Sequence, residues 1–213
     1  MAIQTSTLTV KGKVGNFVGR TGTGGRYYAG KYQPVVKNPR TEAQTAWRAK
    51  FKTVSQFCSS LAGWAKKMCK GLTKNGTAYS NLMFLNPPST VAVPGQQAGS
   101  YVIDFTKVKL SSGSMDLPYN IVANVDGNDI VVNWTDNSGL GNAEKADQCA
   151  LVCYNAVKGA AVIILDAAKR EDSTASIPVP TNWSSETLHA YIAFQRDNGA
   201  QTSGSHYLGS FTV

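Results

Sequence analysis

The stretch GRYYAGKY, residues 25–32, has the spacing of a nucleotide-binding P-loop: a glycine, four residues, a second glycine and a lysine. A P-loop cradles phosphates with its backbone N–H groups, and it needs a Ser or Thr after the lysine to hold Mg²⁺. Here Tyr32 follows Lys31, and Pro34 opposes a helix starting at the lysine. We therefore interpret these glycines as relief of crowding in a twisted β-hairpin, with Tyr27, Tyr28 and Tyr32 distributed over its two faces.

Other residues that could carry chemistry are isolated in the sequence. His189 and His206 fall in or near predicted strands, and no G-x-S-x-G nucleophile elbow accompanies them. Asp126, Asp129 and Asp136 lack the fixed close spacing of a calcium loop. We predict no catalytic, cofactor-binding or metal-binding residues, and we expect a protein that is not an enzyme.

The four cysteines, Cys58, Cys69, Cys149 and Cys153, show no C-x-x-C spacing. With only two histidines in the chain, a zinc site is not indicated. We expect buried free thiols, as in a reducing compartment.

Charge is distributed unevenly along the chain. Residues 1–76 hold ten Lys and four Arg against one acid, Glu42, for a net charge of +13, whereas residues 77–213 carry a net charge of −5. Such asymmetry indicates a polyanionic or acidic partner for the basic part. In the basic part, basic and aromatic side chains are interleaved, and this mixture is typical of grooves that bind single-stranded nucleic acid. Docking on an acidic protein surface and simple solvation of the lysines remain open.

The predicted partner- or anion-binding residues are the cations Lys11, Lys13, Arg20, Arg26, Lys31, Lys37, Arg40, Arg48 and Lys52. The aromatic residues interleaved with them are Phe17, Tyr27, Tyr28 and Tyr32.

The elements that must position these residues begin with short β-like runs separated by glycines in the first forty residues. This pattern predicts two or three short strands, with a hairpin tip at residues 21–25. The run K-N-P-R-T at 37–41 then forms a rigid corner, because Pro39 fixes one backbone angle and Thr41 can cap a helix. Arg40 is the member of this corner that we expect to reach a carboxylate.

An amphipathic helix is predicted after the corner. From Trp47 to Leu72 the apolar residues recur in alternating steps of four and three, which places them in one stripe, and Gly63 is a weak point that could split the helix. The expected packing residues are Trp47, Phe51, Val54 and Leu61. We expect the stripe to pack on the glycine-rich hairpin of the same chain, with a coiled coil as the alternative.

The rest of the chain changes to a β pattern. TAYSNLMFLN, residues 77–86, predicts a short helix stopped by Pro87 and Pro88, and residues 87–100 read as a linker. The predicted strands are 101–110, 120–125, 130–135, 148–155, 160–165, 175–179, 187–195 and 205–213. Seven or eight short strands favour a β-sandwich. We therefore predict a mainly β protein with a basic hairpin-plus-helix region (1–86), a linker (87–100) and a sandwich (101–213).

Two resemblances add to this interpretation. DIVVNWTDNS, which places Trp134 in an early strand, and LHAYIAFQRDNGAQTSGSHYLGSF resemble a fibronectin type III or immunoglobulin-like module. KGKVGNFVGR followed by VVKNPRTEAQTAWRAKF resembles the N-terminal signature of an uncharacterised family widespread in Bacteroidota and their phages. This second resemblance implies a phage-linked or Bacteroidota intracellular protein and supplies no catalytic residues.

These observations favour a non-enzymatic structural protein, most simply a phage virion component such as a minor capsid, connector or tail protein. It would dock through its basic N-terminal region on other structural proteins and form a homo-oligomer. The alternative is a nucleic-acid-binding protein that coats single-stranded DNA or RNA. No apolar run of signal-peptide or membrane-spanning length appears, so we expect a virion or host-cytoplasm location and no membrane partner.

Overall fold

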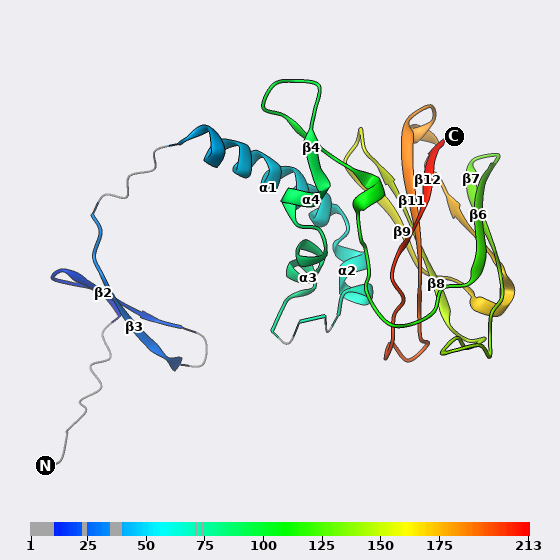
Figure 1. Ribbon diagram of the computed structural model, residues 1–213, viewed down its shortest axis with the longest axis horizontal. Helices are drawn as coiled ribbons and strands as arrows, with labels where there is room; N and C mark the ends of the chain where they lie inside the picture. The colour runs from blue at the N-terminus through cyan, green and yellow to red at the C-terminus, as the bar shows by residue number, and fades with distance from the viewer. Residues whose placement is uncertain (1–10, 23–24, 35–39, 71, 74) are drawn as a thin grey trace, which may run out of the picture. The chain divides into compact units, whose positions relative to one another are not determined.

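A computed structural model describes residues 11–22, 25–34, 40–70, 72–73 and 75–213 (Figure 1). The chain divides into two compact units, Met1–Thr41 and Glu42–Val213. The boundaries that we predicted after residues 86 and 100 differ from this division. The physical reason is that the helices share a buried core with the sandwich.

The first unit contains a three-stranded antiparallel sheet in the order β1-β2-β3. Its strands are β1 (Gly12–Val14), β2 (Phe17–Thr21) and β3 (Tyr27–Lys31). The sequence predicted two or three short strands here, and three are present among the described residues. The GRYYAGKY stretch forms strand β3, so its backbone belongs to a sheet ladder rather than to a loop that leads into a helix.

The second unit begins with helices. They are α1 (Glu42–Ser60), α2 (Ala62–Met68), α3 (Ala78–Leu85) and the single turn α4 (Pro88–Val91). The predicted long helix is split at Leu61, two residues before the weak point at Gly63. The predicted short helix is α3, and the Thr77 side chain caps it by accepting a hydrogen bond from the Ser80 N–H.

Two antiparallel sheets form a β-sandwich, in the orders β10-β7-β6 and β12-β11-β8-β9. Its strands are β6 (Tyr119–Asp126), β7 (Asp129–Thr135), β8 (Gln148–Asn155), β9 (Ala160–Lys169), β10 (Thr174–Pro178), β11 (Thr187–Gln195) and β12 (His206–Thr212). A separate small sheet pairs β4 (Ala92–Pro94) with β5 (Tyr101–Ile103). The predicted mainly β fold with a helical segment is confirmed.

The four-stranded sheet is the middle of three layers, with helices over one face and the three-stranded sheet over the other (Figure 1). In β8, Ala150 and Val152 belong to the helix-side core, whereas Cys149 and Leu151 belong to the core inside the sandwich. Strand β11 divides its residues between the two cores in the same way. The central strands are therefore apolar on both faces.

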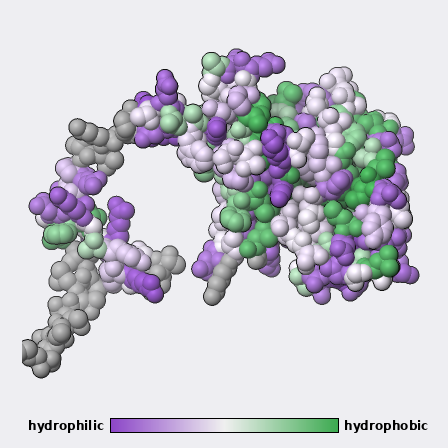
Figure 2. All heavy atoms as spheres, in the orientation of Figure 1, coloured by the Kyte–Doolittle hydropathy of each residue, from purple (hydrophilic) through white to green (hydrophobic). Residues whose placement is uncertain are grey.

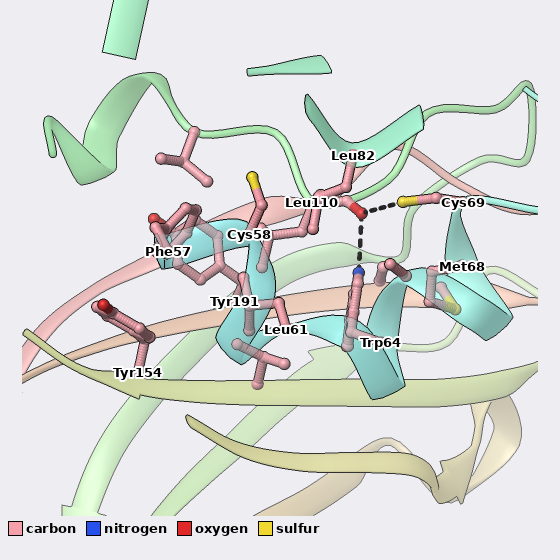
Figure 3. Packing of buried hydrophobic residues seen from close by; sticks show 14 of the residues in the cluster. Phe57, Cys58, Leu61, Trp64, Met68, Cys69, Leu82, Leu110, Tyr154 and Tyr191 are labelled. Atoms are coloured by element: carbon pink, nitrogen blue, oxygen red, sulfur yellow. Dashed lines mark hydrogen bonds between the residues drawn. The ribbon is translucent and has the colours of Figure 1, made fainter. Parts of the chain in front are cut away.

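The helical stripe is held on this middle sheet. Figure 3 shows Trp64 and Cys69 of the helical region pointing at one acceptor, the Leu110 carbonyl, which Trp64 Nε1 reaches at 2.8 Å and Cys69 Sγ at 3.2 Å. Gln195 Nε2 of β11 donates to the Lys67 carbonyl at 3.1 Å. The predicted cover for the stripe, the glycine-rich hairpin, is corrected: from Val54 onward the stripe packs on the sandwich.

Two segments differ from their predicted structure. The strand predicted over 101–110 ends at Ile103, because Asp104 accepts a hydrogen bond from the Thr106 N–H and starts a 3₁₀ turn. The segment predicted as a linker, 87–100, contains α4 and β4, and Val91 and Ala92 are buried in the helix-side core. It is part of the packed unit.

A fully buried ion pair lies at one end of the sandwich. The guanidinium of Arg170 donates to Asp147 Oδ2 at 3.1 Å, to Asn137 Oδ1 at 2.7 Å and to the Asp116 carbonyl at 2.9 Å. The Arg170 carbonyl accepts from Trp134 Nε1 at 2.8 Å. Both charged side chains of the pair are 0% exposed, and Asp147 Oδ1 also lies 3.3 Å from Nε of Arg196, so the buried carboxylate is shared by two guanidinium groups.

Removing one member of this pair should be costly. We expect Arg170→Met to lower the free energy of unfolding by about 3–5 kcal/mol, because it removes the fully buried partner of Asp147 and leaves Asn137 Oδ1 and the Asp116 carbonyl without their guanidinium donor, while Arg196 still pairs with Asp147. The matched control is Lys67→Met, which breaks the more exposed pair with Asp166 and should cost about 1 kcal/mol or less. Urea unfolding followed by tryptophan fluorescence measures both. Equal losses in the two variants would show that the buried pair does not stabilise the fold.

A half-buried histidine gives the fold a dependence on pH. The His189 ring stacks on Phe105 with centroids 3.7 Å apart, and its Nδ1 lies 2.9 Å from the Tyr207 hydroxyl. Burial lowers the pKa of His189 to about 4, from an ordinary value of 6.5. The folded protein therefore keeps this ring neutral where the unfolded chain takes up a proton.

Stability should consequently fall as the pH drops from about 6.5 toward 4, and the loss between pH 7 and pH 5 should be about 1–2 kcal/mol. Urea unfolding at the two pH values measures it. His189→Gln should reduce the difference between pH 7 and pH 5 by that amount. A variant with the same pH dependence as the original chain would rule His189 out as its source.

Candidate functional site

The N-terminal sheet has two chemically different faces. Residues directly opposite in neighbouring strands point to the same side, and side chains alternate along each strand. The register pairs Lys13 with Val18 and Arg20 with Tyr28, whereas Val14 pairs with Phe17 and Thr21 pairs with Tyr27. One face carries Lys13, Val18, Arg20, Tyr28, Gly30 and Tyr32, and by alternation Lys11; we call it the basic face. The other carries Val14, Phe17, Tyr27 and Ala29, with Lys31 beside Phe17; we call it the apolar face.

The basic face holds its cations next to rings. Lys13 Nζ lies 3.8 Å from the centroid of the Tyr32 ring, and Arg20 stands opposite Tyr28 in the register. The Tyr32 N–H donates to the Asn16 carbonyl at 2.6 Å, which extends the pairing of β2 and β3 to this ring. The two tyrosines are thus held at the two ends of the face.

A hollow of about 720 Å³ opens on the basic face. Its lining consists of Lys13, Val18, Arg20, Tyr28, Ala29, Gly30, Lys31, Tyr32 and Gln33. Gly30 of β3 lies between the two tyrosines in the sequence, and no atom of the residues that the structure describes lies within 4 Å of the position that a Cβ there would take. The missing side chain leaves the centre of the hollow open.

The apolar face is open to solvent. Val14 is 56%, Phe17 61% and Tyr27 44% exposed. Figure 2 shows hydrophilic and hydrophobic side chains both at the surface of this unit. No strand residue of the sheet is buried, so the sheet has no core of its own.

The start of α1 carries the remaining predicted residues. Val54 and Leu61 are fully buried, as expected for packing residues, but Trp47 is 51% and Phe51 49% exposed. The buried residues of α1 are Val54, Phe57 and Cys58, so the apolar stripe enters the core only in the second half of this helix. Trp47 and Phe51 line up at helical spacing with Ser55, whose hydroxyl lies 2.8 Å from the Tyr79 hydroxyl of α3.

The structure places the other predicted cations at the surface. Arg26, Arg48 and Lys52 are exposed, and Arg40 is exposed with a φ of 50°, in the left-handed region that a non-glycine residue seldom adopts. Lys37 lies outside the described residues. The structure therefore brings Lys13, Arg20, Tyr28 and Tyr32 together around one hollow, and it does not unite all the predicted cations in one site.

From the sequence we expected Tyr27, Tyr28 and Tyr32 to be distributed over the two faces of the hairpin, and the register places Tyr27 on one face and Tyr28 and Tyr32 on the other. We did not predict which cations share a face with which aromatic residues. Side chains alternate between the two faces along each strand, so odd and even positions separate the two groups. Applying this rule across strands requires the register of β1 with β2, which was not predicted.

The four cysteines, which are the remaining candidates for reactive side chains, are buried and have little thiolate character. All four cysteines are buried free thiols, and burial raises the pKa of Cys58, Cys69 and Cys153 to about 12 and also raises the pKa of Cys149. In the described part of the chain, no group of three or more His, Cys, Asp or Glu side chains is arranged to hold a metal ion. None of the described helices has the length and apolar character needed to cross a membrane.

A family model described as "Family of unknown function (DUF6266)" matches residues 9–209. None of the curated proteins compared with the chain matches it.

Because the N-terminal sheet has no buried core, it should open more easily than the second unit. We expect brief digestion with trypsin to cut after Arg20, Arg26 and Lys31 while residues 42–213 stay intact, as seen by mass spectrometry. Lys67 and Arg170, inside the packed unit, serve as internal controls. Cleavage after these two residues as early as after Arg20 would contradict the difference in stability.

Proposed function

The chain belongs to DUF6266, a family of unknown function, and we propose that it is a non-enzymatic assembly protein whose N-terminal sheet docks into a larger particle. The observation that carries this proposal is the exposed apolar face formed by Val14, Phe17 and Tyr27 on a sheet without a core of its own.

The energetics support docking through this face. A small isolated sheet is marginally stable unless a hydrophobic face is covered. Fully covering a Val or Phe side chain contributes about 1.5–3 kcal/mol. Covering Val14, Phe17 and Tyr27 on a partner surface therefore supplies several kcal/mol, which would both order the sheet and hold it to the partner.

The second unit suits the role of a rigid body in such a particle. Its helices and sandwich share packed cores, and the exposed start of α1, with Trp47 and Phe51, gives this unit an apolar surface of its own. The sandwich fold by itself hosts many functions, so it specifies no chemistry. Because the N-terminal sheet provides the attachment to the particle, we assign the sandwich a role in display or in contacts with other molecules.

The setting that we propose is a phage particle. The runs KGKVGNFVGR and VVKNPRTEAQTAWRAKF, which resemble the signature of a family from Bacteroidota and their phages, support it. The protein would be a minor capsid, connector or tail component, found in the virion or the host cytoplasm. Its partners would be other structural proteins and further copies of the chain.

The test is incorporation into particles. Particles purified by density from cells that carry the phage should contain the chain at a fixed ratio to the major structural protein, as quantified by mass spectrometry. A double variant, Phe17→Ser with Tyr27→Ser, should reduce incorporation at least about tenfold, because it removes two large side chains from the docking face.

The matched control replaces one aromatic residue of the opposite face, Tyr28→Ser, and should incorporate normally. Particles that lack the chain altogether would refute the proposed setting. Normal incorporation of the Phe17→Ser, Tyr27→Ser variant would refute docking through the apolar face.

A further inference from the structure

We propose that the basic face of the N-terminal sheet binds single-stranded nucleic acid, with a base seated in the hollow over Gly30. The docking function proposed above uses the opposite face, so this inference goes beyond it. A sheet with one side on protein and the other on nucleic acid would join the two.

The first argument comes from Gly30. Glycine weakens a strand, and it occurs inside one where φ is positive, where other parts of the chain crowd the position or where a ligand approaches the backbone closely. Gly30 has no positive φ, its pairing with Val18 is regular, and among the described residues no atom lies within 4 Å of where its Cβ would be. Close approach of a ligand is the one of these three reasons that remains, and the hollow of about 720 Å³ is where it would occur.

The second argument comes from the rings beside the hollow. Tyr28 and Tyr32 stand on the same face four residues apart, which in a strand is about 13 Å, with only the Gly30 backbone between them. Tyr28 is 57% exposed. Proteins that bind single strands stack bases on such aromatic side chains without reading their sequence.

The third argument is the charge around the rings. Lys13 lies against Tyr32 and Arg20 stands opposite Tyr28, so each ring has a cation beside it that can meet a phosphate. Residues 1–41 contain no Asp or Glu that would neutralise these cations. A base on the ring and a phosphate on the neighbouring cation match the repeating unit of a nucleic acid strand.

These features separate single strands from other anions. An acidic protein surface would use the cations but has no flat group to stack on Tyr28 and Tyr32. In a duplex the bases are paired and stacked inside, so the hollow would stay empty. The combination of rings, cations and a glycine gap fits unpaired bases.

The experiment uses the full chain and a fluorescein-labelled dT20 oligonucleotide, with binding measured by fluorescence anisotropy. Lys13 and Arg20 can neutralise about two phosphates, so affinity should fall roughly sevenfold between 50 and 200 mM salt. Tyr28→Ser and Tyr32→Ser should each weaken binding about 5- to 150-fold, the range found for loss of one stacked base. Tyr28→Phe and Tyr32→Phe keep the ring and should bind within about threefold of the original chain.

Gly30→Val provides a control for loss of folding. Valine favours a strand, so this variant should make the sheet more resistant to trypsin while it fills the hollow and weakens dT20 binding about tenfold or more. The matched variants of the opposite face, Phe17→Ser and Tyr27→Ser, should bind dT20 normally. Their effect on particle incorporation tests the docking function separately.

Several results would overturn the inference. One is an absence of dT20 binding at 50 mM salt, and another is equal loss of binding in the variants of the two faces. Displacement of dT20 by polyglutamate as efficient as that by unlabelled dT20 would assign the face to an acidic protein. Duplex DNA that binds as tightly as dT20 and is insensitive to Tyr28→Ser would assign it to the phosphate backbone alone.

Discussion

Burial of both faces of the four-stranded sheet is the constraint on which the rest of the structure depends. Strand β8 sends Leu151 into the sandwich and Val152 toward the helices, so neither face can be polar. A shift of one residue in its pairing would exchange two differently shaped cores, which fixes the register strongly. The helices cannot leave the sheet without exposing Val152 and Tyr191, and residues 42–213 therefore behave as one body.

The sheet in the first 41 residues differs from the sandwich because neither of its faces is buried. Their sheet is held by backbone pairing and has no buried strand residue, so its side chains are free to meet other molecules. Phe17 serves one face and Tyr28 the other, and both large rings stay exposed. The chain thus separates its stability, which lies in the second unit, from its recognition chemistry, which we place in the first.

Much of the sandwich could be predicted because its strands carry local signals. Strands β8 and β11 have the predicted bounds, since the dipeptides Lys158-Gly159 and Asn198-Gly199 mark turns after them. The covering of the sheet by helices was missed, although the unbroken apolar run CALVCY indicates a strand buried on both sides. In the candidate site the residue types were predictable. Their assignment to faces was not, because it depends on pairing between strands.

The four thiols of the chain, Cys58, Cys69, Cys149 and Cys153, are sheltered in the packed interior, where the reactive thiolate form is scarce near neutral pH. A cysteine introduced at a surface position would react with a maleimide dye or a cross-linker far faster than any of them. The natural sequence is therefore already suited to site-specific labelling, and distances between its two units can be followed by spectroscopy without first replacing native residues.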